Sequence, residues 1–527
     1  MVKGFRQIAL LTMLSRVLGM LRDMAFAYFL GAGVLMDGWT VGFKIPNLAR
    51  RLFGEGAASS SLIPVYSAEL EKDKNKADRL ALTVVTAVFL VLVAAVLLGD
   101  TIIWIYYRYF SVYQSTKLKL ILSGIMLPYA ILICVTALLA GILNAHRHFA
   151  APAIAPVLLN ILIIMSLCFS RWFLGMPPRS QVLTLTVAVI FAGLIQLLIQ
   201  VPPLRARGVS LRPAWDIHTE AFKKVFFLMG PMVIGLTATQ INTLADDLIA
   251  LWLSGSDEKG QFFTWFSRQI KYPVWEGAVS HLFYAQRLYQ FPLGVLGISL
   301  ATAIFPVMSS DAAKNDFTAL SRTVSRGLRS AVFIALPATV GLLMVGKPLV
   351  SVLFERGRFT AHDTNLTMWT LSFYVLGLAG YFAQQVATRA FYAMQDSKIP
   401  ARSAVIAVFT NIMLNLTLIW PLGTGGLAAS TALCSYLQVI ILITVLRKRL
   451  GSGILEGLAW AAGKTIASTA CMYVVILILL TLSKNLADGF KLLLTVPLAV
   501  VVYILAAKIL RIEMLSLLIG SRQQKTQ

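Results

Sequence analysis

The chain has 527 residues, of which 58% are hydrophobic and 13% are charged, and its formal net charge is +23. A soluble domain carries about 25% charged residues, so this composition excludes a soluble protein and indicates a polytopic membrane protein. Most basic residues lie in short loops between apolar runs, where the positive-inside rule explains them. We therefore expect anionic membrane lipids as partners and no nucleic-acid binding.

Apolar runs of about 20 residues recur along the chain and predict an all-α polytopic membrane protein with about fourteen transmembrane helices. The loops on one side carry more Lys and Arg than the loops on the other, which places both termini in the cytoplasm. The four cysteines lie far apart within apolar runs, so we interpret them as packing residues. The expected helix centres are residues 18, 50, 90, 130, 162, 192, 236, 295, 335, 376, 410, 435, 468 and 498.

Two pairs of segments indicate an internal repeat. LIPVYSAEL at 62–70 resembles IFPVMSSDA at 304–312, and ILNAHRHFAAP at 142–152 resembles AFYAMQDSKIP at 390–400. Six helices fit between the copies, so both halves should have the same orientation in the membrane. We predict two pseudo-symmetric six-helix lobes and two further helices. The predicted ranges are 1–208 for the N-terminal lobe, 209–450 for the C-terminal lobe, and 451–527 for helices 13 and 14 with a cytoplasmic tail.

The first two apolar runs carry charges where lipid tolerates them least. Arg16, Arg22 and Asp23 lie in the middle of the first run. A charge at bilayer depth costs between ~2.5 and ~10 kcal/mol, so such residues normally face a polar cavity. Snorkelling to headgroups is the alternative, but it is weak for residues deep inside a span. The second run carries Lys44, Arg50, Arg51 and Glu55.

The chemistry of these cations indicates what the cavity binds. The planar fork of arginine matches phosphate oxygens and stays charged at any working pH. In the second half of the chain, Arg287 shortly precedes the helix-breaking Pro292. Arginines that face each other across a lobe interface therefore predict a site for a phosphate or diphosphate anion. For Arg51 a structural ion pair with Glu55, four residues further along a helix, is the main alternative.

Other ionisable residues are less specific. Asp246 and Asp247 lie within the seventh span, where they could bind a cation or pair with an arginine, and their spacing does not separate these roles. Asp37 lies at the outer end of the first span, where a solvated or capping role is the alternative to ligand binding. The histidines do not have metal-site spacing, and we find no phosphate-binding glycine loop, nucleophile elbow or HExxH. We therefore expect neither an enzyme nor a cofactor.

The motifs themselves resemble a known family. SRVLGMLRDMAFAYFLGAG, then Asp37 and FKIPNLARRLFGEGAASSSLIPVY, are similar to the N-terminal signature of the MurJ (MviN) family of lipid II flippases, within the MOP exporter superfamily. The similarity continues through LNAHRHFAAPAIAPVLLN, RLYQFPLGVLGISLATAIFPVMS, LFERGRFTAHDT and AFYAMQDSKIP, and so covers nearly the whole chain.

This resemblance implies a MATE-like fold, in which helices 13 and 14 form a hydrophobic groove for the polyprenyl tail. It implies a monomer that moves lipid II, the undecaprenyl-diphosphate-linked peptidoglycan precursor, from the cytoplasmic to the outer face of the inner membrane by alternating access. The implied diphosphate-binding residues are Arg16, Arg22, Arg50 and Arg287, and the further cavity residues are Asp23, Asp37, Lys44, Asn47, Arg51 and Glu55. Sodium use by some members would place a sodium ion at Asp246.

Two features depart from the family pattern, and two rival functions stay open. Position 290 is Gln where relatives often carry an acid, and the 254–280 loop is long and rich in aromatic residues suited to the outer membrane interface. One rival is another MOP exporter, for a drug or a lipid-linked oligosaccharide, although a drug exporter should have an acidic cavity. The other is a polyprenyl-phosphate glycosyltransferase, for which only Asp246 and Asp247 could supply acidic metal ligands.

Overall fold

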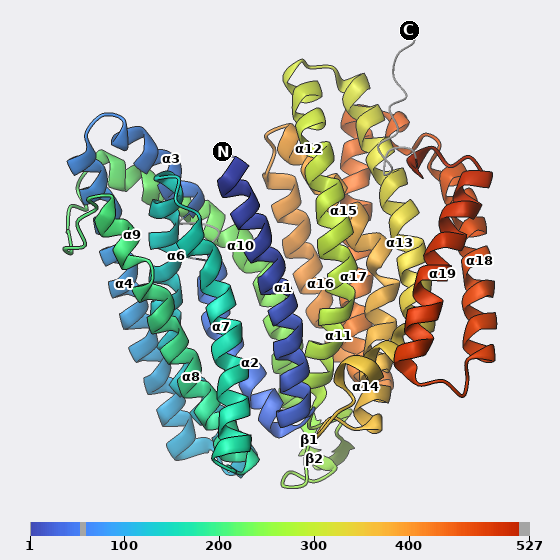
Figure 1. The fold of residues 1–527 in the computed structure, drawn as a ribbon, viewed down its shortest axis with the longest axis horizontal. Coiled ribbons are helices and arrows are strands. Elements are labelled where there is room, and N and C mark those ends of the chain that lie inside the picture. Colours follow the sequence, from blue (N-terminus) through green and yellow to red (C-terminus); the bar gives the residue numbers. More distant parts are fainter. Residues whose placement is uncertain (1, 53–58, 516–527) are drawn as a thin grey trace. The chain divides into compact units, whose positions relative to one another are not determined.

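The computed structural model of the protein describes residues 2–52 and 59–515, nearly all of them in helices (Figure 1). Within this part of the chain, ten helical segments are long and apolar enough to cross a membrane. α14 and α15 meet at an angle of 42° and would together make an eleventh. The prediction of an all-α polytopic membrane protein is therefore confirmed, while the count of fourteen helices stays a prediction.

The chain divides into two compact units. The first comprises Met1–Asp247, Ser254–Ser280 and Arg356–Phe359. Its helices are α1 (Val2–Leu30), α2 (Val34–Ala49), α3 (Ser59–Leu70), α4 (Lys74–Ile105), α5 (Gln114–Met126), α6 (Tyr129–Ala145), α7 (Ala150–Cys168), α8 (Pro178–Leu198), α9 (Val201–Ala206) and most of α10 (Glu220–Trp252). Short π-helical turns, η2 (Tyr106–Phe110) and η3 (Phe169–Phe173), end α4 and α7.

The second unit comprises Leu248–Leu253, His281–Glu355 and Thr360–Gln527. Its elements are most of α11 (Ala278–Pro292), η4 (Leu293–Gly297), α12 (Ile298–Ala313), α13 (Phe317–Phe354), α14 (Ala361–Leu376), α15 (Leu378–Ala393), α16 (Lys398–Leu422), α17 (Thr424–Leu450), η5 (Ser452–Leu455), α18 (Leu458–Leu482) and α19 (Asp488–Ile509). The last two helices run side by side and pack on α13 (Figure 1). The ranges predicted for the two lobes come from the sequence repeat, whereas these two units are defined by contacts between residues. The predicted lobe ranges therefore stay predictions.

Close helix packing in the first unit depends on small residues. A Cβ atom on Gly38 would lie 3.0 Å from a methyl carbon of Leu122, and one on Gly42 would lie 3.3 Å from the backbone of Ser123. These two glycines, four residues apart, let one side of α2 approach α5 closely. The contact fixes the position of the helix that carries Lys44 and Arg50.

A glycine also ends the first helix. Gly31 has a φ of +72°, a left-handed conformation that favours glycine, and its amide closes the last turn of α1. A Cβ atom there would lie 2.8 Å from the carbonyl oxygen of Arg358. The backbone amide of Arg358 in turn donates to the carbonyl of Tyr28, at 3.1 Å. The C-terminal end of α1 is therefore held by the short 356–359 segment.

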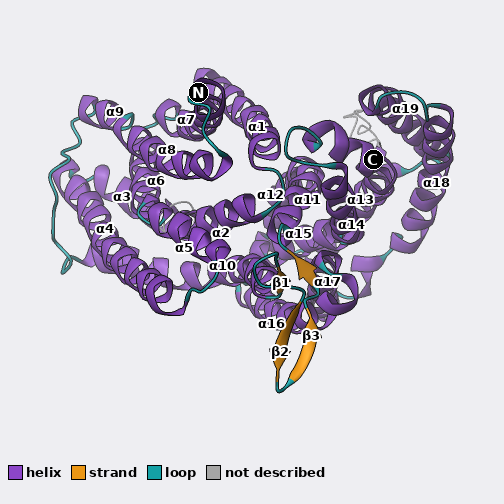
Figure 2. Ribbon diagram, turned by 90° about the horizontal axis from the view of Figure 1, so that it is seen from below, coloured by secondary structure: helices purple, strands orange, loops and turns teal. Residues whose placement is uncertain are grey.

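The long 254–280 segment contains strands, which the sequence did not predict. β2 (Phe262–Trp265) pairs antiparallel with β3 (Arg268–Lys271), while the two-residue β1 (Ser254–Gly255) pairs in parallel with β4 (Val274–Trp275). Figure 2 shows β2 and β3 as a narrow hairpin that extends away from α2 and α5. Phe266 at its tip is 88% exposed. Its location at the outer membrane interface stays a prediction.

One carboxylate fastens this segment to α5. Glu258 accepts hydrogen bonds from both the backbone N–H and the hydroxyl of Ser115, each at 2.9 Å. The bond from the Ser115 backbone lowers the pKa of Glu258, so the carboxylate stays charged. The inserted segment is thus tied to the helix against which α2 packs.

Candidate functional site

Arg22 is the most highly organised of the predicted site residues. Its Nε and Nη2 donate to one oxygen of Asp23, at 3.0 and 2.7 Å, and its Nη1 donates to the side-chain oxygen of Asn160, at 2.9 Å. The side-chain amide of Asn160 donates to the Ser15 carbonyl at 3.1 Å. Asn160 of α7 therefore bridges Arg22 and the backbone of α1. A guanidinium has five N–H donors, and these three bonds leave two of them for a ligand.

Arg16, almost two turns before Arg22 on the same helix, is exposed and lacks the hydrogen bonds that hold Arg22. Its side chain is exposed, and within the described part of the chain no hydrogen bond or ion pair involves it. Asp23, by contrast, is 3% exposed and offsets the charge of Arg22. The structure therefore places Asp23 as the partner of Arg22, while Arg16 has no acidic partner among the residues that the structure describes.

Arg50 and Asn47 lie together at the end of α2. The Nε of Arg50 donates to the Asn47 side-chain oxygen at 2.9 Å, and both residues are half-buried. Arg51 is exposed and donates to the side chain of Gln240 on α10 at 3.0 Å. Glu55, the predicted partner of Arg51, lies outside the described residues.

Lys44 pairs with an aspartate of α10. Its ammonium group forms an ion pair with Asp247 and also donates to the carbonyl of Thr243, at 2.9 Å. Asp247 is 2% exposed, so the pair compensates a carboxylate that could not otherwise stay charged in an apolar surrounding. Of the two roles that the sequence left open for Asp247, the structure has ion pairing, with a lysine in place of the expected arginine.

Asp37 caps the start of another helix. It is 1% exposed and accepts from the backbone N–H groups of Gly277 and Ser280, at 2.7 and 2.8 Å, and from the Ser280 hydroxyl at 2.6 Å. These donors lie just before and within the first turn of α11, where a carboxylate satisfies free N–H groups. The capping alternative for Asp37 is therefore the one that the structure has.

Arg287 lies on α11 in the second unit. It is half-buried, and its guanidinium carbon lies 4.6 Å from the centre of the Phe283 ring, one turn away. Its neighbour in the sequence, Gln286, donates to the Tyr374 hydroxyl at 3.0 Å. Gln290 is exposed.

Asp246 is the residue at which the resemblance would place a sodium ion. Asp246 is 1% exposed, and its neighbour Asp247 is engaged by Lys44. In the part of the chain that the structure describes, no group of three or more His, Cys, Asp or Glu side chains could hold a metal ion. Hard cations also take backbone carbonyl and amide oxygens, which such a group does not include, so the sodium ion at Asp246 stays a prediction.

Two polar residues that bind predicted site arginines, and one further arginine, were missed in the sequence. Asn160 and Gln240 bind arginines of other helices, and Arg389 on α15 lies 5.4 Å from the centre of the Phe305 ring of α12. Arg389 had the same signal as the chosen arginines, a cation within an apolar run. For Asn160 the signal was weaker, an amide directly after APVLL and before ILII.

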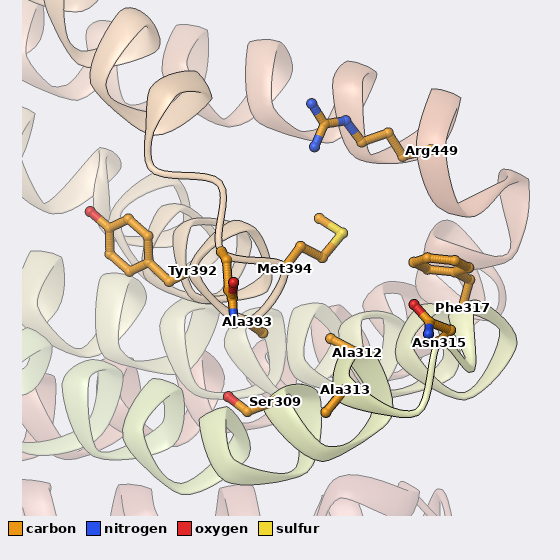
Figure 3. A pocket seen from close by; sticks show the side chains of 10 residues that line it. Ser309, Ala312, Ala313, Asn315, Phe317, Tyr392, Ala393, Met394 and Arg449 are labelled. Atoms are coloured by element: carbon orange, nitrogen blue, oxygen red, sulfur yellow. The ribbon is translucent and has the colours of Figure 1, made fainter.

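A separate cavity of about 620 Å³ lies in the second unit where α12, α15 and α17 end (Figure 3). Phe317, Tyr392 and Met394 line it together with small residues of α12. The one lining cation, Arg449, is already paired with Asp396 at 2.8 Å. The cavity therefore has no free cation among its lining residues and does not match an anion site.

Comparison with known proteins identifies the family. The family model described as "Lipid II flippase MurJ" matches residues 26–498. The chain belongs to the MurJ family. A probable lipid II flippase MurJ from Vibrio cholerae is 32% identical over 448 residues, which cover 82% of this chain and 81% of the relative. The lipid II flippase MurJ of Burkholderia cenocepacia is 31% identical over 452 residues, or 83% and 82% of the two chains.

Solved structures agree with this assignment at the level of the fold. A lipid II flippase MurJ in an inward closed conformation matches with a TM-score of 0.76 at 22% identity, over 95% of this chain and 98% of that one. A MATE multidrug transporter of the MOP superfamily in an inward-facing conformation has a TM-score of 0.63 at 13% identity, over 83% and 95%. The expected MurJ and MATE-like architecture is therefore confirmed.

Proposed function

We propose that this protein moves lipid II from the cytoplasmic to the outer face of the bacterial inner membrane by alternating access. Its membership of the MurJ family carries this proposal, since the curated relatives are lipid II flippases. It acts as a monomeric multi-pass transporter with both termini in the cytoplasm, and without chemical catalysis. The basic character of α1, and of Arg50 and Arg51 directly after α2, favours it over a drug exporter, because a diphosphate needs compensating positive charge.

The diphosphate is held by Arg16, Arg22, Arg50 and Arg287. Two unused N–H donors of Arg22, and an Arg16 without an acidic partner among the described residues, support this assignment in α1. Arg50 lies directly after α2, where Asn47 anchors its Nε. Charge-assisted hydrogen bonds then replace the hydration of the anion. Three further residues act through their partners rather than on the diphosphate. Lys44 pairs with Asp247 of α10, Asp37 caps the first turn of α11, and Asp23 positions Arg22.

Two further elements of the proposal concern the tail and the driving force. α18 and α19 lie outside the repeat, and we assign them the polyprenyl tail, which a closed cavity could not hold. The membrane potential contributes ~2.3 kcal/mol per charge per 100 mV and favours outward movement of an anion. The membrane potential is the proposed driving force, and a sodium ion at Asp246 stays a separate prediction.

Lipid II flipping in vesicles tests the arginines. We expect Arg22→Ala to abolish flipping by the full-length protein while its melting temperature and membrane insertion change little. Arg22→Lys should rescue only in part, since lysine keeps the charge but loses the fork. Asn160→Ala should give an intermediate rate, because it releases Arg22 without removing it. Wild-type flipping by the Ala variants of Arg16, Arg22, Arg50 and Arg287 would refute the site.

Photocrosslinking tests the tail. A lipid II analogue with a photoreactive polyprenyl chain should label residues of α18 and α19, and excess unlabelled lipid II should abolish this labelling. Labelling that excludes both helices, in a protein that still flips lipid II, would refute their role.

A further inference from the structure

The segment between α10 and α11 contains a β-hairpin with a strained tip. The last residue pair of β2 and β3 is Trp265 with Arg268, so the loop that joins the strands consists of Phe266 and Ser267. Both loop residues have left-handed φ values, 45° and 64°. Two-residue hairpin loops of this kind favour Asn-Gly, because a bulky side chain adopts a left-handed φ only at a cost.

The Phe266 ring is also exposed. Its exposed fraction is 88%, the highest of any large hydrophobic residue that the structure describes. A strained backbone and an apolar ring in water are both unfavourable, so packing within this chain does not explain a phenylalanine at the tip. Strain that persists at such a site is typical of a contact with a ligand or a surface. A surface that buries the ring would offset both costs.

One face of the hairpin is exposed and carries a ring beside a cation. Side chains alternate between the two faces of a strand, so the paired Phe262 and Lys271 lie on one face. Phe263 and Ile270 lie on the other, where both are half-buried. The Phe263 ring lies 4.9 Å from that of Tyr272, which explains this burial. Phe262, by contrast, is 51% exposed, and Lys271 is exposed.

The charges of the hairpin are all positive. From residue 261 to residue 275 the sequence contains Arg268 and Lys271, six aromatic residues, and no Asp or Glu. Both cations are exposed, and neither forms an ion pair within the part of the chain that the structure describes. Aromatic rings together with cations suit the headgroup level of a membrane. Charge complementarity therefore favours an anionic lipid surface as the partner.

The hairpin is positioned to reach such a surface. With both termini in the cytoplasm, as proposed above, the connection between α10 and α11 lies on the outer side of the membrane. Figure 1 shows the strands at the level where α1 ends, and Figure 2 shows the hairpin projecting sideways beyond α5 and α10 of its own unit. A segment that leaves the helices sideways at this level passes over lipid headgroups.

We propose that the β2–β3 hairpin is a membrane-binding element of the outer face. It inserts the rings of Phe266 and Phe262 among the headgroups of anionic phospholipids, while Lys271 and Arg268 contact the lipid phosphates. Burial of the rings offsets the strain of the tip. A strand added by a partner protein would use the edges of the hairpin and gives no reason for a strained ring at its tip. The inference rests on the proposed outer location of the segment and not on lipid II.

Fluorescence of the full-length protein in vesicles of phosphatidylglycerol and phosphatidylethanolamine tests the lipid contact. The probe is the fluorophore NBD on Ser267→Cys, in a background whose four native cysteines are replaced by alanine. We expect blue-shifted emission, and roughly threefold stronger quenching by lipids with a nitroxide beneath the headgroup than by a nitroxide in water. Asp257→Cys, at an exposed position of the same segment outside the hairpin, is the matched control and should give the opposite ratio. Water-like emission at position 267 would overturn the proposal.

Two sets of variants separate the ring from the charges. Phe266→Gly should relieve the left-handed turn and preserve the melting temperature, but it should reduce lipid quenching at position 267 roughly threefold. The double variant Arg268→Gln, Lys271→Gln should weaken this quenching in phosphatidylglycerol and not in phosphatidylcholine. Arg179→Gln, which removes an exposed cation at the start of α8, is its control. A lower melting temperature of Phe266→Gly with unchanged quenching would show that the ring packs on the protein, against the proposal.

Thiol labelling in spheroplasts tests the outer location separately. A membrane-impermeant maleimide should modify Asp257→Cys from outside the cell. Labelling only after lysis would place the segment in the cytoplasm and overturn the assignment to the outer leaflet. Because both leaflets of the vesicles contain the same lipids, this outcome is distinct from a failure of the hairpin to contact lipid.

Discussion

At the ends of α6 and α15 the chain makes the same turn with different side chains. The amides of Arg147 and His148 donate back to Asn144 and Leu143, both at 2.9 Å. In the second unit the equivalent residues Gln395 and Asp396 donate to Tyr392 and Phe391, at 3.0 and 2.9 Å. Arg147 and Gln395 have left-handed φ values of 57° and 58°. The repeat seen in the sequence is therefore matched in the backbone of these two turns.

The side chains around the first turn form a polar network. The Tyr66 hydroxyl donates to Asp78 at 3.0 Å and lies 2.8 Å from Nε2 of His146. Lys74 reaches across to donate to the Arg207 carbonyl at 2.8 Å. Together these bonds tie α3, α4, α6 and the end of α9 to one another.

The equivalent residues of the second unit are mostly apolar. In the sequence repeat, Met308 and Met394 correspond to Tyr66 and His146. Counted from the helix-capping residues Asp73 and Asp316, Phe317 corresponds to Lys74 and Ser321 to Asp78. The Ser321 hydroxyl has no hydrogen-bond partner within the described residues. Phe317 and Met394 line the open cavity of Figure 3. Helix-end hydrogen bonds thus preserve a repeated backbone while the side chains around it diverge.

Breaking the polar network should have the largest effect. Asp78→Ala leaves the buried Tyr66 hydroxyl without its acceptor and should lower the free energy of unfolding by about 3 kcal/mol. Ser321→Ala, the matched change in the second unit, should alter it by less than about 0.5 kcal/mol because its hydroxyl makes no bond. Thermal unfolding in detergent measures both. Equal losses would mean that the network contributes no more than the apolar arrangement.

The turns themselves should respond alike. Arg147→Val and Gln395→Val place a β-branched residue at a left-handed φ, and each should cost about 1 kcal/mol of unfolding free energy. The glycine variants at the same positions should be neutral or gain a few tenths, roughly 0.5 kcal/mol at most. Thermal unfolding of the four variants compares the units directly. A loss in only one unit would show that the two turns contribute differently to the free energy of unfolding.

The ion pair at the second turn should have a smaller effect. Burial raises the pKa of Asp396, but hydrogen bonds from the Ile399 amide and from Arg449 outweigh it and lower the pKa overall. The Arg449 and Asp396 side chains are 42% and 17% exposed, so the pair is partly screened. Arg449→Gln should therefore cost about 0.5 kcal/mol. The loss should disappear in 1 M salt, and a salt-independent loss would point to packing instead.

The smallest effect should be a pH dependence that only the first turn has. Burial lowers the pKa of His146, and Arg207 and Lys74 lower it further, while Asp78 acts in the opposite direction. Since the folded-state pKa lies below the unfolded value of 6.5, stability is complete above pH 6.5 and falls as the pH decreases towards the folded pKa. His146→Met, which copies the second unit, should flatten the melting temperature between pH 7 and 5. An unchanged slope would exclude His146 as the source.

The sequence alone determined the class of protein and much of its organisation. Hydropathy along the chain identified the ten long apolar helices of the described residues, because lipid requires about 20 apolar residues per helix whatever the helix packs against. Cations within apolar runs marked Arg16, Arg22, Arg50 and Arg287, and the repeat located two turns that the structure shows to be alike. These signals are local or periodic, so they can be recognised in the sequence without knowledge of the tertiary structure. The motifs then carried the family resemblance that the comparisons confirmed.

Only the tertiary structure decided which charges are compensated and by what. Arg22 is held by Asn160, 138 residues away, Lys44 by Asp247, 203 residues away, and Asp37 caps residues about 240 positions further on. No periodicity connects such partners, because packing of α7, α10 and α11 brings them together. The hairpin at 262–271 was missed for a related reason: its strands are four residues long and lie beside much stronger helical signals.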